Sequence, residues 1–379
     1  MPEGYTLVGY GRMLVDAARI EAYGRALKAA VRADSVVLDL GTGTGFFAVL
    51  AAKLGARRVY GIDPSDAIRA ARELARENGV ADRVEFIQDV STRVTLPERA
   101  DVLVCDLRGV LPPFQDIVGT MADARARLLA PGATLIPRRD TLLAAPLESA
   151  EAWEDALGPA EALGIDLAAA RRAAANGWTR GRFHPGQLLA EPLAWAELDY
   201  RAATGPDVRG GGEWTVSRAG TAHGLAVWFQ ADLGFGSGFG SGPGTRTIYQ
   251  TAFFPWPGVV AVVPGDRIRA ELRASLVAGE YVWFWDSAVE RAGKPPVAFR
   301  QTTFVANAPS PDRLRRRGDG YLAALGEDGR IDSFVLSRMD GRTPLGQIAR
   351  ELKASFPDRF ATWEAALVRA GALSERYAG

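Results

Sequence analysis

The sequence has few of the side chains that bind zinc or form disulfides. Its 379 residues include one cysteine and two histidines, so a disulfide framework is excluded and a zinc site lacks ligands. A surplus of charge is also missing, because 45 basic and 45 acidic side chains give a formal net charge of zero. A protein whose main partner is nucleic acid needs a basic surplus. We therefore expect neither a metal nor a nucleic-acid partner.

Long apolar runs are absent as well. No run of about 18 apolar residues occurs, and the N-terminus lacks the apolar core of a signal peptide. We therefore expect a cytoplasmic protein that does not enter a membrane. Hydrophobic content of 47% and charged content of 24% are ordinary for a globular protein, and the length predicts about two or three domains.

The first third of the chain alternates strand and helix patterns. Apolar runs typical of buried strands occur at 36–40, 58–63, 84–87 and 100–105. Apolar residues have helical spacing over 14–32, before the first run. Further helical patterns separate the first run from the second and the second from the third. Strands separated by helices of this length form a parallel, doubly wound sheet. We predict a Rossmann-like domain over residues 1–138.

The pattern changes after residue 138. Aromatic and β-branched runs alternating with turns predict an antiparallel, β-barrel-like domain over 139–308, with a broken helical stretch at 150–185. The glycine-rich segment 234–244 is expected to be a long flexible hairpin loop. A Pro-Ser-Pro linker at 309–311 precedes a small unit at 313–379. A hairpin from 322–325 and 331–336 followed by two helices would make this unit a winged-helix-like α+β module.

A glycine loop follows the first strand and carries the strongest chemical signal. The run Val37-Leu38-Asp39-Leu40-Gly41-Thr42-Gly43-Thr44-Gly45 brings backbone close to a ligand at the carboxyl edge of the sheet. Asp39 in the approach to the loop suits a cation better than a phosphate. Asp63, at the end of the second strand, is placed to accept the hydrogens of two ribose hydroxyls. The pair favours S-adenosylmethionine over a nicotinamide cofactor.

These motifs resemble those of class I S-adenosylmethionine-dependent methyltransferases. Over roughly residues 5–305 the chain is similar to the protein arginine methyltransferases, whose Met-Leu-x-Asp-x-x-Arg helix matches Met13-Leu14-Val15-Asp16-Ala17-Ala18-Arg19. The resemblance implies that Arg19 binds the cofactor carboxylate and that Met13 packs in the site. The stretch 150–185 falls where the family has a dimerisation arm, which implies a homodimer. The expected cofactor-binding residues are Met13, Arg19, Asp39, Gly41, Gly43, Gly45, Asp63 and Asp89.

The chain differs from this family at the residues expected to bind the methyl acceptor. The family's two glutamates clamp a guanidinium, whereas here Asp106 matches the first and neutral Gln115 the second, with Asp116 one position further. The family's Thr-His-Trp loop is also replaced, by Arg-Thr-Ile-Tyr at 246–249. A fork of two carboxylates suits a guanidinium, while an amine needs one acceptor. We expect Asp106 to orient the acceptor nitrogen and carry its proton, with Asp116 and Tyr10 as weaker candidates.

Residues 313–379 resemble the PqqD-like domains that recognise leader peptides of ribosomally synthesised natural products. The match rests on Asp340-Gly341-Arg342-Thr343 and the helix after it, and it implies leader binding by strand addition to a small sheet. A structural cap and a nucleic-acid winged helix are the alternatives.

The leading hypothesis is an S-adenosylmethionine-dependent N-methyltransferase acting on an amine of a ribosomal precursor peptide. The alternatives are a protein or peptide arginine N-methyltransferase and a catalytically silent peptide-binding scaffold.

Overall fold

The computed structural model describes residues 7–277, 279–306, 315–316 and 318–378. The chain divides into two compact units, Met1–Ala308 and Pro309–Gly379, and each is described by itself. The predicted linker at 309–311 lies outside the described residues. No helix within the described ranges is long and apolar enough to cross a membrane.

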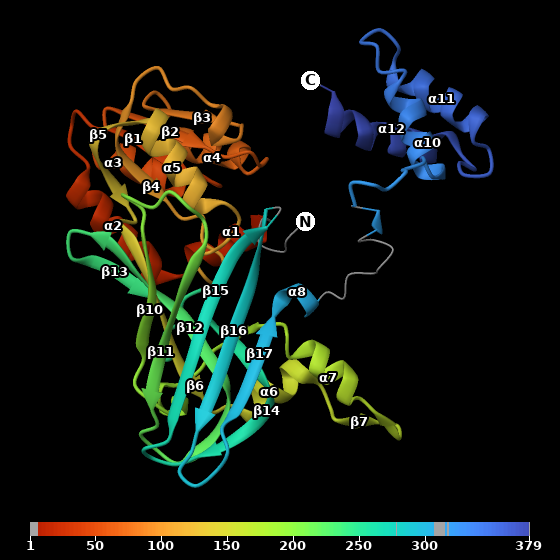
Figure 1. Cartoon of the computed structure of the whole chain (residues 1–379). Coiled ribbons are helices and arrows are strands. Elements are labelled where there is room, and N and C mark those ends of the chain that lie inside the picture. The colour runs from red at the N-terminus through yellow and green to blue at the C-terminus, as the bar shows by residue number, and fades with distance from the viewer. Residues whose placement is uncertain (1–6, 278, 307–314, 317, 379) are drawn as a thin grey trace. The chain divides into compact units, whose positions relative to one another are not determined.

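The first part of the larger unit is a five-stranded parallel sheet of order β3-β2-β1-β4-β5, covered by helices (Figure 1). Its elements are α1 (Leu7–Leu14), α2 (Ala17–Ala30), β1 (Val36–Leu40), α3 (Phe46–Lys53), β2 (Arg58–Ile62), α4 (Ile68–Glu77), β3 (Val84–Ile87), η1 (Ser91–Arg93), β4 (Ala100–Cys105), α5 (Ile117–Arg127) and β5 (Leu129–Ile136). The predicted doubly wound sheet is confirmed. The strand order reverses between β1 and β4, and ligands of such sheets bind at the carboxyl ends of the strands there.

The helix expected over 14–32 is two helices. Asp16 separates them, because its side chain caps α2 by accepting a hydrogen bond from the backbone N–H of Arg19 at 3.2 Å. The other oxygen of Asp16 accepts the N–H of Ile248 at 2.8 Å. This carboxylate therefore ties the start of the sheet domain to the segment that leads into β14.

The rest of the larger unit is built mainly on two antiparallel sheets, so the predicted antiparallel β-rich character is confirmed. One has the order β10-β6-β12-β14-β9, with β13 paired to β12, and the other has the order β11-β15-β16-β17. Phe254 of one sheet and Trp285 of the other lie 4.9 Å apart between ring centroids, so the sheets share a core. The strands are β6 (Arg139–Leu147), β9 (Thr179–Gly181), β10 (Leu193–Asp199), β11 (Val208–Thr215), β12 (Gly220–Gly234), β13 (Ser237–Gly240), β14 (Thr251–Val262), β15 (Arg267–Val277), β16 (Glu280–Glu290) and β17 (Val297–Thr302), and the short helix α8 (Thr303–Ala306) follows.

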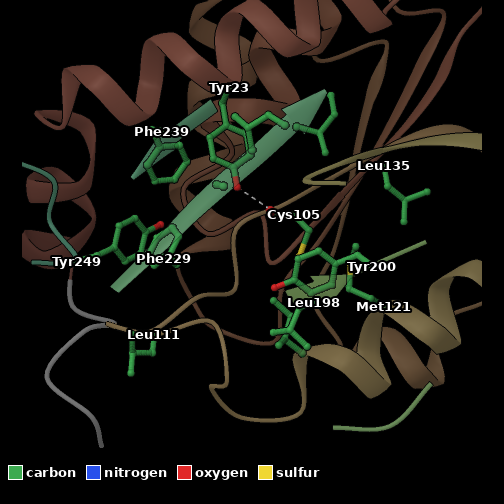
Figure 2. Packing of buried hydrophobic residues seen from close by; sticks show 14 of the residues in the cluster. Tyr23, Cys105, Leu111, Met121, Leu135, Leu198, Tyr200, Phe229, Phe239 and Tyr249 are labelled. Atoms are coloured by element: carbon green, nitrogen blue, oxygen red, sulfur yellow. Dashed lines mark hydrogen bonds between the residues drawn. The ribbon is translucent and has the colours of Figure 1, made fainter. Parts of the chain in front are cut away.

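The glycine-rich segment 234–244 is not the flexible loop that its composition predicts. It contains β13, and the Ser237 hydroxyl donates to the backbone oxygen of Ala22 in α2 at 2.7 Å. Phe239 is buried and lies beside Tyr23, Phe229 and Tyr249 (Figure 2). The prediction was wrong because alternate residues of this glycine-rich strand are buried against the sheet domain.

The stretch 150–185 is only partly helical. It contains α6 (Ala150–Leu157), a two-stranded hairpin of β7 (Glu161–Ala162) and β8 (Ile165–Asp166), α7 (Ala168–Ala174) and β9, and η2 (Pro185–Gln187) completes it (Figure 1). At the hairpin, Leu163 is fully exposed and Ile165 largely so. The hairpin therefore presents apolar side chains that this chain does not cover.

The smaller unit is helical in its described part. Its helices are α10 (Glu327–Leu336), α11 (Leu345–Ser355) and α12 (Trp363–Tyr377), packed around a core of their own. The predicted strand at 331–336 is wrong, since these residues belong to α10. Ile331, Phe334 and Val335 all contact this core, and their spacing fits one face of a helix rather than a strand. The described residues of this unit therefore include no sheet edge.

Candidate active site

A pocket opens where the sheet order reverses. It brings together six of the residues expected to bind cofactor or acceptor, and α1 and α2 close its side. The lining residues are Tyr10, Met13, Leu14, Arg19, Ile20, Asp39, Gly41, Thr42, Thr44, Phe46, Phe47 and Asp106. No cluster of metal-ligating side chains occurs among the described residues.

The glycine loop between β1 and α3 forms the floor of this pocket. Gly41 and Gly43 both have positive φ, at +75° and +53°, a region that other residues rarely adopt. A Cβ atom on Gly41 would lie 2.3 Å from Leu107, and one on Gly43 would lie 2.4 Å from the ring of Tyr10. Glycine is therefore required both by the turn and by the close packing above it.

Asp39 lies at the end of β1 and is almost completely buried. Its Oδ2 accepts a hydrogen bond from the Thr42 hydroxyl at 2.6 Å and from the backbone N–H of Ala48 at 2.9 Å. Burial raises the pKa of Asp39 to about 7, although these hydrogen bonds act in the opposite direction. A cation bound at this end of the pocket would favour the ionised carboxylate.

Asp63 holds the same loop from the next strand. Its Oδ2 accepts the backbone N–H of Gly43 at 2.8 Å, and its Oδ1 accepts both the N–H and the hydroxyl of Ser65, at 2.8 and 2.6 Å. The carboxylate is thus fixed at the carboxyl end of β2 beside the glycine loop. This is the place from which the sequence predicts contact with two ribose hydroxyls.

Asp106 and Arg19 form an ion pair at the other end of the pocket. Arg19 Nε donates to Asp106 Oδ2, and Arg19 Nη1 donates to the backbone oxygen of Met13 at 3.1 Å. The hydroxyl of Tyr249 donates to the same carboxylate, 2.7 and 2.8 Å from its two oxygens. Arg108 adds a further donor at 2.9 Å.

These donors decide the charge of Asp106. Burial acts to raise its pKa, but the guanidinium groups of Arg19 and Arg108 prevail and hold the pKa below its ordinary value. Asp106 is therefore an ionised hydrogen-bond acceptor and a poor general base. Its expected role as the carrier of the acceptor's proton does not fit these contacts, whereas a role in orienting the acceptor does.

Five predicted site residues do not line the pocket; they are Gly43, Gly45, Asp63, Asp89 and Asp116. Asp116, Asp89 and the neutral Gln115 have other surroundings. Asp116 caps α5 by accepting the backbone N–H of Gly119 at 3.0 Å. Asp89 is half-buried and accepts the N–H of its neighbour Val90. Gln115 is exposed, with φ of +47°. None of the three lines the pocket.

Arg108 and Tyr249 are partners of Asp106 that were not predicted from the sequence. Tyr249 lies 143 positions from Asp106, in the segment where the arginine methyltransferase family has Thr-His-Trp. Arg108 is two positions from Asp106, but its second acid, Asp140, lies on β6. The Tyr249–Asp106 and Arg108–Asp140 contacts have no local signal, because each needs the two domains to pack first.

Comparison with known proteins gives two kinds of match. Residues 24–137 match the family model described as ribosomal protein L11 methyltransferase (PrmA). The chain is 27% identical over 262 residues to protein arginine N-methyltransferase 1 of Schizosaccharomyces pombe, covering 65% of this chain and 75% of that protein. It is 31% identical over 169 residues to the probable protein arginine N-methyltransferase 6 of Arabidopsis thaliana, covering 44% and 39%. The chain spans about two fifths of the length of this relative.

Solved structures show the same fold. The Trypanosoma brucei PRMT1 enzyme-prozyme heterotetrameric complex with AdoHcy aligns over 79% of this chain and 100% of the matched chain, with a TM-score of 0.71 and 21% identity. Arabidopsis thaliana protein arginine methyltransferase 10 covers 79% and 97%, with a TM-score of 0.69 and 22% identity. The fold and the pocket therefore define a class I methyltransferase domain followed by a β-rich domain. The similarity is to the protein arginine methyltransferase type.

The residues of the pocket fit S-adenosylmethionine. Asp39 offers a carboxylate to a cationic amino group, Asp63 offers acceptors to ribose hydroxyls, and Arg19 offers a guanidinium to a carboxylate. A Cβ atom at Gly41 or Gly43 would clash with the side chains of Leu107 and Tyr10, so glycine lets these side chains pack against the loop. That Asp39, Asp63 and Arg19 bind the cofactor stays a prediction from the sequence.

Proposed function

We propose that this chain is an S-adenosylmethionine-dependent N-methyltransferase that modifies a protein or peptide, with an arginine side chain as the first candidate acceptor. The observation that carries the proposal is the pocket that joins the glycine loop to the Arg19–Asp106 pair. The names of its relatives favour arginine as the acceptor.

The chemistry needs positioning more than acid–base catalysis. Bound S-adenosylmethionine would supply a methyl group on a sulfonium: the C–N bond would form as the C–S bond breaks, the sulfur would keep the electron pair, and the nitrogen would release one proton to water. Ionised Asp106 would accept a hydrogen bond from the acceptor nitrogen and so orient its lone pair. Tyr10, which packs over the glycine loop, would exclude water.

A direct test uses cofactor with an isotopically labelled methyl group and two matched peptide pools. One pool contains arginine, and in the other every arginine is replaced by lysine. Tandem mass spectrometry of the products is expected to locate label on arginine nitrogen. Label only on lysine or on peptide amino termini would transfer the assignment to an amine.

An amine of a ribosomal precursor peptide is the second candidate acceptor. The observation in its favour is the departure at the second acid: Gln115 is neutral, exposed and outside the pocket. A guanidinium would then meet one carboxylate, Asp106, which already accepts hydrogen bonds from three side chains. An amine needs only a single acceptor.

We further propose that residues 313–379 bind the leader of such a peptide. Support comes from the sequence resemblance and from exposed apolar side chains in the unit, among them Leu322, Val368 and Tyr377. Because the described part of the unit has no sheet edge, a helical groove is the better candidate than strand addition. Removing residues 309–379 should raise KM for a full-length precursor but not for its leaderless core peptide. An equal loss with both peptides would favour a structural cap.

A homodimer through residues 150–185 is also proposed. The exposed Leu163 and Ile165 of the β7–β8 hairpin support it, since a second copy could cover them. Light scattering should give twice the chain mass, and replacing both residues by aspartate should give the monomer. A wild-type monomer at micromolar concentration would contradict the proposal.

A catalytically silent scaffold is the remaining alternative. It predicts that the chain binds S-adenosylhomocysteine or a peptide but transfers no label to either peptide pool.

A further inference from the structure

The guanidinium of Arg108 is fully buried beside the pocket. Its Nε and Nη2 donate to the two oxygens of Asp140, each at 2.8 Å, in a bidentate pair. Its Nη1 donates to Asp106 at 2.9 Å and to the hydroxyl of Tyr23 at 2.6 Å. Because Asp140 belongs to β6 and Asp106 follows β4, this one side chain connects the β-rich domain to the acceptor end of the pocket.

Rigid neighbours enclose this guanidinium. The rings of Phe229 and Phe239 lie 5.4 and 5.7 Å from its central carbon, and Figure 2 shows both rings in the same buried cluster as Tyr23. Tyr200 donates its hydroxyl to Asp140 at 2.7 Å. The Arg108–Asp140 pair is thus held by aromatic packing and by hydrogen bonds on both partners.

Arg108 does not reach the pocket itself. Asp106 and Arg19 line the pocket, whereas the side chain of Arg108 has no exposed surface. Any effect of Arg108 on a bound ligand must therefore pass through Asp106. Its guanidinium lies behind that carboxylate and fixes one of its two oxygens.

Several charged or titratable groups face Asp106. They come from α2, from its own loop, from the segment before β14, from β1 and from β4, and they are Arg19, Tyr23, Arg108, Tyr249, Asp39 and Cys105. Only Arg19 and Arg108 among them are cations. Without Arg108, one guanidinium and the Tyr249 hydroxyl would oppose the burial that raises the pKa of this carboxyl.

We propose that Arg108 is a positioning residue of the active site: anchored on Asp140, it holds the Asp106 carboxylate ionised and oriented so that Arg19 is in place for the cofactor carboxylate. The proposal rests on the proposed function, since it assumes that Arg19 binds the cofactor.

The test compares the full-length variants R108M/D140N and D140N. The two variants differ only at position 108. Because both carry D140N, removal of Arg108 leaves no buried carboxylate without its partner at position 140. The probe is S-adenosylhomocysteine, and the measurement is its Kd by calorimetry from pH 6 to pH 9. In R108M/D140N, the pKa of Asp106 should lie above its value in D140N, because one of the two opposing guanidinium groups is gone, so its pairing with Arg19 should weaken as the pH falls. We expect binding about tenfold weaker relative to D140N at pH 6 and a smaller difference at pH 9. Protonation of Asp106 would lower the pKa of Asp39, since the two carboxylates interact, and this change strengthens binding at pH 6 and so opposes the expected loss.

A third variant separates positioning from folding. R108K keeps the cation beside Asp106 but loses the bidentate grip on Asp140, so its Kd should vary with pH as in wild type. Thermal unfolding of each variant, with and without the probe, shows which proteins are folded. A folded R108M/D140N that binds as tightly as D140N at every pH, or more tightly at pH 6, would overturn the proposal. If the double variant does not fold, R108K with a steeper pH dependence than wild type would overturn it. Wild-type protein that fails to bind the probe would instead defeat the proposed function.

Discussion

The two ends of the pocket are built from different kinds of contact. At the cofactor end, Asp39 and Asp63 accept hydrogen bonds from backbone N–H groups and hydroxyls between two and 20 positions away along the chain. At the acceptor end, Asp106 accepts from the side chains of Arg19 and Tyr249, which lie 87 and 143 positions away. One end is specified within a short stretch of sequence, and the other is completed by Tyr249 only after the two domains have packed together.

Because of this difference, the two ends of the pocket should respond differently to substitution. Backbone donors cannot be changed by substitution, so the glycine loop presents the same surface in any chain that can adopt its turns. Side-chain donors can be replaced individually, and each replacement changes the charge and orientation of Asp106. We expect variants at the cofactor end to lose affinity, and variants at Asp106 to lose turnover more than affinity.

The largest effect is expected from Asp63→Ala. This change removes the acceptor for ribose hydroxyls and leaves the N–H of Gly43 without its 2.8 Å partner. Loss of a charged hydrogen-bond partner costs about 1.5–3 kcal/mol, so binding of S-adenosylhomocysteine should weaken roughly 10- to 100-fold. Calorimetry checks this, with Asp66→Ala as the control because Asp66 is exposed on the same loop. Unchanged affinity in Asp63→Ala would contradict the ribose assignment.

Asp106→Asn should affect turnover more than affinity. The amide keeps the size of the side chain but loses the charge that pairs with Arg19 and Arg108. Removing one oriented group of this kind lowers kcat by about 100-fold. Asp116→Asn should reduce kcat less than about threefold, because an asparagine still caps a helix. Equal losses in the two variants, measured with labelled cofactor, would mean that the acceptor end is not centred on Asp106.

The same contrast explains how much could be predicted from sequence. The run 36–40 is β1 as predicted, because a continuous apolar run before glycines has few alternatives. The prediction for the glycine-rich segment is wrong, since the pairing of β13 with β12 and its contact with α2 are tertiary. The strand predicted at 331–336 is wrong although Ile331 and Val335 have helical spacing. Arg108 carries no signal at all, because its role depends on Asp140 across the domain boundary.

A smaller effect, set by pH, should appear at the cofactor end. Burial raises the pKa of Asp39 from 3.8 to about 7, so this carboxyl is mostly protonated at pH 6 and mostly ionised at pH 8. The ionised form attracts a cationic amino group, so binding of S-adenosylhomocysteine should strengthen about tenfold between these pH values. The free protein should lose stability as the pH rises from about 4 to about 7, since the folded pKa lies above the unfolded one and the proton is bound only by the folded state in that window. Asp39→Asn should bind weakly at both pH values, and a wild-type Kd that does not change with pH would exclude this role.

The smallest effect is expected from Asp116→Ala, and it tests whether Asp116 belongs to the acceptor site or only caps a helix. Asp116 accepts the N–H of Gly119 at 3.0 Å and is exposed, so Asp116→Ala removes a helix cap and no pocket contact. Loss of such a cap costs about 1 kcal/mol, which urea unfolding should show as a lower midpoint with an unchanged slope. Affinity for S-adenosylhomocysteine should stay as in wild type. If the variant instead keeps its stability and loses turnover, Asp116 belongs to the acceptor site, which would then have the second acid that arginine recognition needs.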